Sequence, residues 1–130
     1  MPRQYVKGTW QEQAAFSPAV ITRGGRIIWV AGHVGTTDAQ GNSLAGDFAA
    51  QARQTFRNLE ATLEQAGGKL KDIVTMTVFL LDVRHGPEFL RIRSETFGGD
   101  FPASALVTVA GFATPEIMLE IQAIAVTGEE

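Results

Sequence analysis

The sequence contains no cysteine, which excludes a disulfide framework, a thiolate nucleophile and a thiolate zinc site. Only two histidines occur, His33 and His85, so a metal site built from several histidines is nearly excluded. No apolar run approaches the ~20 residues that a membrane helix needs, and residues 1–5 have no apolar stretch behind them that marks a secretion signal. We therefore expect a cytoplasmic protein without a metal or a resident cofactor.

A basic cluster is missing as well. The 11 Lys and Arg residues are mixed with 14 Asp and Glu residues and give a net charge of −3. This pattern argues against nucleic acid and membranes as partners. What is present, 45% hydrophobic and 19% charged residues in a chain of 130, is typical of one globular domain. We expect residues 1–130 to fold around one core.

The first half of the chain predicts strands followed by a helix. Residues 1–9 suit a short edge strand, and the apolar, β-branched residues 16–23 and 26–32 flank Gly24-Gly25, which favours a β-hairpin. Residues 35–46 are typical of a loop. Asp47 suits a helix N-cap, and Gly67-Gly68 suits the helix end. Between them, one apolar stripe indicates a helix of about five turns: Phe48, Ala52, Phe56, Leu59, Leu63 and Ala66.

The second half of the chain again predicts strands and a helix. Residues 73–81 predict a strand that is parallel to the hairpin's last strand, because a helix separates the two. Gly86-Pro87-Glu88 opens a second helix, with Phe89, Leu90 and Phe97 on its core side and Gly98-Gly99 at its end. Residues 104–110 and 117–127 predict two final strands.

This element order predicts an α+β fold, a mixed six-stranded sheet with both helices on one face. Two helices cannot cover the second face, and the late strands carry apolar residues on both faces. Self-association through the uncovered face solves this problem, and closed cyclic assemblies are its usual form.

Short motifs occur in order along nearly the whole chain: Ala49-Ala50-Gln51-Ala52-Arg53-Gln54 with Asn58, Ala66-Gly67-Gly68, Asp72-Ile73-Val74 with Thr77-Val78-Phe79, Phe101-Pro102-Ala103, and Glu120-Ile121-Gln122-Ala123-Ile124-Ala125. Together they resemble the RidA/YjgF family of reactive-intermediate deaminases. That resemblance implies a chorismate-mutase-like fold, a homotrimer, and a pocket at each subunit interface where enamines or imines are hydrolysed to keto acids and ammonia.

In typical members, the resemblance further implies three pocket residues. An arginine after Phe-Pro-Ala binds the substrate carboxylate through its two-pronged guanidinium, a glutamate in the last strand positions water, and a tyrosine follows an early proline. This sequence has Ser104, Gln122 and Ala19 at these places. It therefore resembles an arginine-less branch of the family, in which the fold is kept and the activity is open.

The remaining polar residues provide candidates for chemistry. Glu120 shares a strand face with Gln122, so its carboxylate could replace the lost base, or else it makes surface hydrogen bonds. His33 ends a strand, and we expect it to share a face with Trp29 and Ala31, where it could take part in chemistry or else only cap the strand end or face the solvent. Glu120 and His33 are thus the catalytic candidates. The expected ligand-binding residues are Trp29, Ala31, Gly32, Ser104, Gln122, Ala19 and Phe16.

Arg91 and Arg93 lie two residues apart on the second expected helix and point in different directions. One of them could bind an anion across an interface, in place of the missing arginine. The alternative is a surface salt bridge with Glu88 or Glu95. His85, in a polar loop, is expected to be structural.

Two functions stay open at this point. One is a hydrolase or deaminase of the enamine/imine type that acts on a small reactive metabolite. The other is a non-catalytic small-molecule-binding or regulatory trimer, which the missing arginine favours. A ribonuclease, a third activity linked with the family, is disfavoured by the acidic balance and the lack of a basic cluster.

Overall fold

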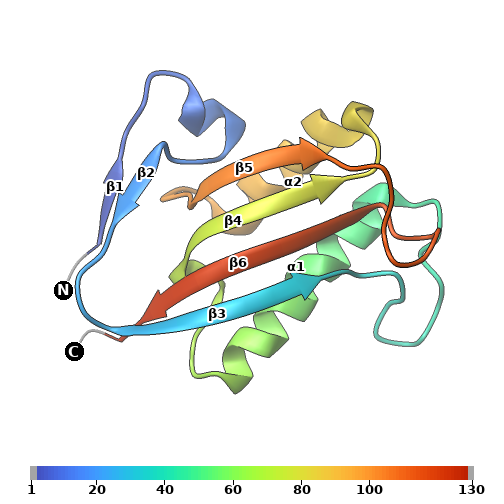
Figure 1. Cartoon of the computed structure of the whole chain (residues 1–130), viewed down its shortest axis with the longest axis horizontal. Coiled ribbons are helices and arrows are strands. Elements are labelled where there is room, and N and C mark those ends of the chain that lie inside the picture. Colours follow the sequence, from blue (N-terminus) through green and yellow to red (C-terminus); the bar gives the residue numbers. More distant parts are fainter. Residues whose placement is uncertain (1–2, 129–130) are drawn as a thin grey trace.

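The computed structural model describes residues 3–128, which form six strands and two α-helices. Four strands make the main sheet in the order β3-β6-β4-β5, with β4 parallel to β5 and β6 antiparallel to both of its neighbours (Figure 1). A separate two-stranded sheet contains β1 and β2. The bounds are β1 Gln4–Val6, β2 Ala19–Ile21, β3 Arg26–His33, α1 Phe48–Gln65, β4 Ile73–Leu80, α2 Gly86–Phe97, β5 Ala103–Thr108 and β6 Leu119–Thr127.

Both helices lie behind one face of the main sheet, as Figure 1 shows. Alternate residues of β4 and β6 point into this layer and are buried against the apolar stripes of α1 and α2. Each buried Val, Leu, Ile or Met side chain among them stabilises the fold by ~1.5–3 kcal/mol. The α+β fold with two helices is therefore confirmed. The core contains Met76, Val78, Leu80, Leu119, Ile121 and Ala123 from the sheet, and Phe56, Leu59, Leu63, Phe89 and Phe97 from the helices.

The helix ends follow the expected local chemistry. The Asp47 carboxylate accepts a 3.1 Å hydrogen bond from the Ala50 amide, which satisfies a free donor in the first turn of α1. At the other end, Gly67 has a φ of 87°, and the Gly68 amide donates to the Leu63 carbonyl at 2.7 Å. β3 and β4 are both antiparallel to β6, so they run parallel to one another, as the intervening helix predicted.

The predicted hairpin around Gly24-Gly25 is wrong in its pairing. β2 pairs with β1, β3 pairs with β6, and the six strands are divided between two sheets. The reason is a contact that is distant in sequence. The Ser17 amide donates to the Pro102 carbonyl at 3.0 Å, and the Ser17 hydroxyl donates to the Phe101 carbonyl at 2.6 Å. These bonds hold the approach to β2 beside the start of β5, at the sheet edge opposite β3.

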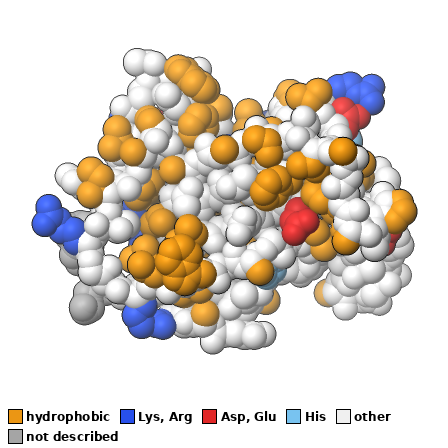
Figure 2. Space-filling model, in the orientation of Figure 1, with side chains coloured by type: hydrophobic (Ala, Val, Ile, Leu, Met, Phe, Trp, Pro, Cys, Tyr) orange, Lys and Arg blue, Asp and Glu red, His pale blue; other side chains and the backbone are white. Residues whose placement is uncertain are grey.

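The second face of the main sheet has no helix over it within residues 3–128. Figure 2 looks onto this face, which we call the open face, and shows hydrophobic side chains exposed over its strands with few charged ones. Trp29, Ile27 and Val107 are among the exposed large apolar side chains of the chain, and Trp29 is 73% exposed. Exposed apolar clusters of this kind mark surfaces for binding or assembly. No helix within residues 3–128 is long and apolar enough to cross a membrane.

Candidate functional site

The strand register separates the expected site residues onto opposite faces of the main sheet. Ser104 is level with Met76 of β4, and Met76 is level with Ala123 of β6. Met76 and Ala123 are buried, so Ser104 lies on the helix-covered face. Gln122 is level with Thr77, and Glu120 with Phe79, which places both on the open face. Within one chain, Ser104 therefore lies on the other side of the sheet from Glu120 and Gln122.

The open face has a hollow of about 410 Å³ around the Glu120 side chain. A Cβ built on Gly32 would overlap the carboxylate of Glu120, so glycine at this position lets the side chain lie where it does. Glu120 makes no ion pair within the described part of the chain, which leaves its oxygens available to a ligand or a water. The hollow is lined by Gly32, Phe79, Val109, Gly111, Phe112, Glu120 and Gln122.

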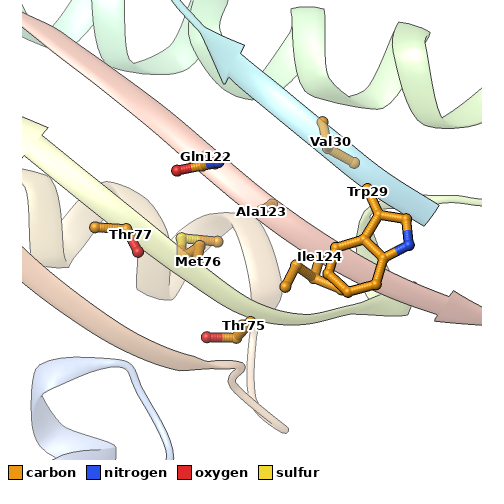
Figure 3. Close-up of a pocket in the computed structure, with 8 residues that line it drawn as sticks. All are labelled: Trp29, Val30, Thr75, Met76, Thr77, Gln122, Ala123 and Ile124. Carbon is orange, nitrogen blue, oxygen red and sulfur yellow. The ribbon is translucent and has the colours of Figure 1, made fainter. Parts of the chain in front are cut away.

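A groove of about 250 Å³ adjoins the hollow on the open face. Figure 3 shows the Trp29 indole extending from β3 over β6, beside Ile124, with the Gln122 side chain further along the same strand. Thr75 and Thr77 of β4 form the other side. Gln122 borders both depressions, so the predicted residues Trp29, Gly32, Glu120 and Gln122 share one surface.

His33 does not share that surface, and the prediction that it faces the same way as Trp29 is wrong. The register between β3 and β6 shifts between Val30 and His33, so His33 lies opposite the buried Ile121. Its Nε2 is 2.7 Å from the Thr62 hydroxyl of α1, and its Nδ1 is 2.8 Å from the Ala31 carbonyl. Because a carbonyl can only accept, Nδ1 is the donor there. His33 thus points toward α1 and away from Glu120, while Ala31 is exposed in the irregular stretch.

On the helix-covered face, Ser104 contacts a buried arginine. Nη1 of Arg93 donates to the Ser104 hydroxyl at 2.6 Å, and Nη2 donates to the Ala14 carbonyl at 3.3 Å. Arg93 is 1% exposed, its Cζ lies 5.2 Å from the centre of the Phe89 ring, and its Nε is buried without a hydrogen-bond partner. Burial lowers the pKa of Arg93 to about 10, so the guanidinium remains protonated at neutral pH.

Arg93 and Ser104 border a cavity of about 400 Å³ between α2, β5 and the N-terminal segment, which we call the α2 cavity. Phe16 lines it and packs edge-on against Trp10, with ring centres 5.5 Å apart. Ala19 does not line this cavity; it is exposed on β2 and paired with Val6. The lining residues are Trp10, Ala14, Phe16, Val83, Gly86, Pro87, Leu90, Arg93, Ser104 and Leu106.

The expectation of a surface salt bridge is wrong for Arg93, and Glu95 pairs instead with Arg53 at 3.2 Å. A signal in the sequence could have located this arginine. Arg93 is four residues from both Phe89 and Phe97, so it occupies the apolar stripe of α2. Arg91 is exposed. Trp10 carried no such signal.

The other histidine has the structural place expected of it. The His85 ring stacks on the Phe48 ring with centres 4.4 Å apart. Within residues 3–128 we find no cluster of three His, Cys, Asp or Glu residues able to hold a metal ion.

Comparisons with known proteins agree on a family. The Endoribonuclease L-PSP family model matches residues 9–127. The chain is 34% identical over 114 residues to the 2-iminobutanoate/2-iminopropanoate deaminase of Rattus norvegicus, covering 88% of this chain and 81% of the relative. It is 31% identical over 127 residues to the 3-aminoacrylate deaminase RutC of Acinetobacter baylyi, covering 96% and 98%. The crystal structure of a Rid-family protein from Yersinia pestis superposes with a TM-score of 0.86 at 26% identity, over 98% of this chain and 100% of that one.

Proposed function

Because this chain belongs to the RidA/YjgF family, we propose that it is a homotrimeric hydrolase of small enamines or imines, with its site in a cleft between neighbouring subunits. One observation carries the proposal: Ser104 and the Glu120–Gln122 pair lie on opposite faces of the same sheet. A single chain cannot close one site around both. A second copy that presents its open face to the β5 edge of the first brings them together.

The character of the open face supports the assembly. Trp29, Ile27 and Val107 are exposed there, and no helix within the described residues covers them. Burying apolar surface stabilises an assembly by roughly 25 cal/mol per Å². In a closed ring of three copies the open face of every subunit is covered, so none of these apolar faces remains exposed to water.

The chemistry needs a group that handles protons beside a positioned water. Water adds to the imine carbon and loses a proton, the nitrogen gains protons, and the C–N bond then breaks to release ammonia and a carbonyl compound. Glu120 is the acid/base group in this proposal, because its carboxylate borders the open-face hollow without an ion-pair partner among the described residues. The neutral Gln122 amide can orient the water but cannot accept its proton.

Hydrolysis of imines generated in place by an amino acid oxidase tests the proposal. Glu120→Gln is nearly isosteric, so we expect it to abolish hydrolysis while the trimer remains intact by sedimentation equilibrium. A monomer at micromolar concentration, or full activity of the variant, would overturn the proposal. The neutral amide of Gln122, at a position where the resemblance implies a glutamate, favours a second function: a trimer that binds its ligand without hydrolysis. In that case the wild type shows no rate above background, and Glu120→Gln changes only the affinity.

A further inference from the structure

We propose that the α2 cavity binds a small carboxylate with a bulky apolar group, and that Arg93 is the residue that holds the carboxylate. This inference depends on features of one chain beside α2. It deepens the proposed function, because Ser104 borders both this cavity and the proposed cleft, and its test measures binding apart from hydrolysis.

The first argument is a buried cation without an anion. Arg93 is 1% exposed, and no Asp or Glu oxygen among residues 3–128 lies within 4 Å of its nitrogens. A charge removed from water is costly unless a countercharge and hydrogen bonds accompany it. The Ser104 hydroxyl and the Ala14 carbonyl are neutral acceptors and only partly satisfy it. An anion that enters the cavity would supply the missing countercharge.

The second argument is the unused hydrogen-bonding capacity of the guanidinium. An arginine has five N–H donors, and Arg93 uses Nη1 for Ser104 and Nη2 for Ala14. Its Nε is buried without a partner. A carboxylate matches a guanidinium because its two oxygens can accept two parallel N–H bonds. A single neutral oxygen lacks both that geometry and the charge.

The third argument is the apolar character of the walls. Five of the lining residues, Trp10, Phe16, Val83, Leu90 and Leu106, present hydrocarbon surface to the cavity. Trp10 is 57% and Val83 is 67% exposed, so a ligand that covers them gains hydrophobic contact. The volume of about 400 Å³ lies within the usual range for small-molecule sites.

The first turn of α2 adds to the preference for an anion. Gly86 and Pro87 border the cavity at the N-terminal end of this 12-residue helix. The helix dipole places partial positive charge there. The carboxylate of Glu88 in the same turn offsets part of this charge, so the preference for an anion comes mainly from Arg93.

Isothermal titration calorimetry of the wild-type protein with three stable probes tests the inference without any catalytic step. Phenylacetate has both features, phenylacetamide lacks the charge, and acetate lacks the apolar group. We expect phenylacetate to bind at least about tenfold more tightly than either of the other two. Equal affinity for phenylacetate and phenylacetamide would overturn the inference, and so would the absence of phenylacetate binding at about 10 mM.

A pair of variants on one helix locates the binding. Arg93→Met keeps a long side chain and removes the charge, and we expect it to weaken phenylacetate binding by about tenfold to a hundredfold. Arg91→Met, at an exposed position of α2, should leave binding unchanged. Binding unaffected by Arg93→Met would overturn the inference. So would a wild type that binds no carboxylate while Arg93→Met dissociates the assembly, because a neighbouring subunit would then fill the cavity. If Arg93→Met does not fold, the selectivity of the wild type for phenylacetate over phenylacetamide decides the matter.

Discussion

The guanidinium of Arg93 donates a 2.6 Å hydrogen bond to the hydroxyl of Ser104. A positive charge on α2 therefore lies beside position 104 of β5, which itself carries a neutral serine. The family resemblance implies an arginine at position 104, and its replacement by serine indicates that a carboxylate-binding group has been lost. In space, a cation is present beside that position. It comes from a different element and approaches from within the core.

Arg93→Met tests whether this arginine serves binding at a cost to stability. A buried charge without an anion is replaced by an apolar side chain of similar length, so we expect the free energy of unfolding to be unchanged or higher by about 1 kcal/mol. Arg93→Ala should instead lower it by roughly 2 kcal/mol, because a cavity remains. Urea denaturation measures both. A loss of more than about 2 kcal/mol in Arg93→Met would assign Arg93 a structural role.

Carboxylate binding at Arg93 should be insensitive to pH over the physiological range. The pKa of Arg93 is lowered by burial to about 10, so the guanidinium is charged from about pH 6 to about pH 9, and binding weakens as the pH passes through about 10. Above that value the folded chain loses this proton while the unfolded chain, with its ordinary higher pKa, still binds it, so Arg93's contribution to the unfolding free energy rises with pH. Calorimetric titrations with phenylacetate from about pH 6 to about pH 10 check the pH dependence of binding. A steep change in affinity near pH 7 would refute the expected insensitivity.

Gly32→Ala tests the place of Glu120. The added Cβ overlaps the Glu120 carboxylate, so the side chain must move, and we expect a loss of imine hydrolysis with little change in stability, because the displaced atoms are the end of a flexible side chain. Gly111→Ala adds a methyl group to the lining of the same hollow without meeting any atom within 4 Å. It should retain activity. Equal rates for the two variants would mean that the position of Glu120 is unimportant.

Trp29→Glu tests the open face as the surface of assembly. Trp29 is 73% exposed in the single chain, and a charge there would have to be desolvated in the proposed trimer. We expect sedimentation velocity to show dissociation at micromolar concentration. Ala61→Glu, on the exposed side of α1, introduces the same charge away from this face and should leave the assembly intact. If Trp29→Glu sediments as the wild type does, another surface holds the subunits together.

The elements that could be predicted from the sequence are those with a local signal. The apolar stripe of α1 lies between Asp47 and Gly67, and both ends behave as single-residue chemistry dictates. β4 and β6 are eight and nine residues long and bury alternate side chains over most of their length, which is enough to define their faces. For these elements the pattern and the packing agree, and the fold class follows from them.

The errors concern contacts between residues far apart in the chain. Nothing near Ser17 indicates that its amide bonds to Pro102, yet that bond places β2 at the edge opposite β3. The register shift before His33 likewise has no local signature and reverses the side on which the imidazole lies. The burial of Arg93 could have been predicted from the sequence, because its spacing from Phe89 and Phe97 places it in the apolar stripe of α2. A charged residue in such a stripe is a candidate for a functional role.

Mixing two inactive variants tests the composite site most directly. Arg93→Met and Glu120→Gln disable residues on opposite faces of the sheet. If each site takes Arg93 from one subunit and Glu120 from its neighbour, every mixed trimer contains one intact site. Co-refolding equal amounts should then restore about a quarter of the wild-type rate of phenylalanine-derived imine hydrolysis. Each variant alone should stay near background. No recovery on mixing, with mixed trimers confirmed by native mass spectrometry, would contradict a site shared between subunits.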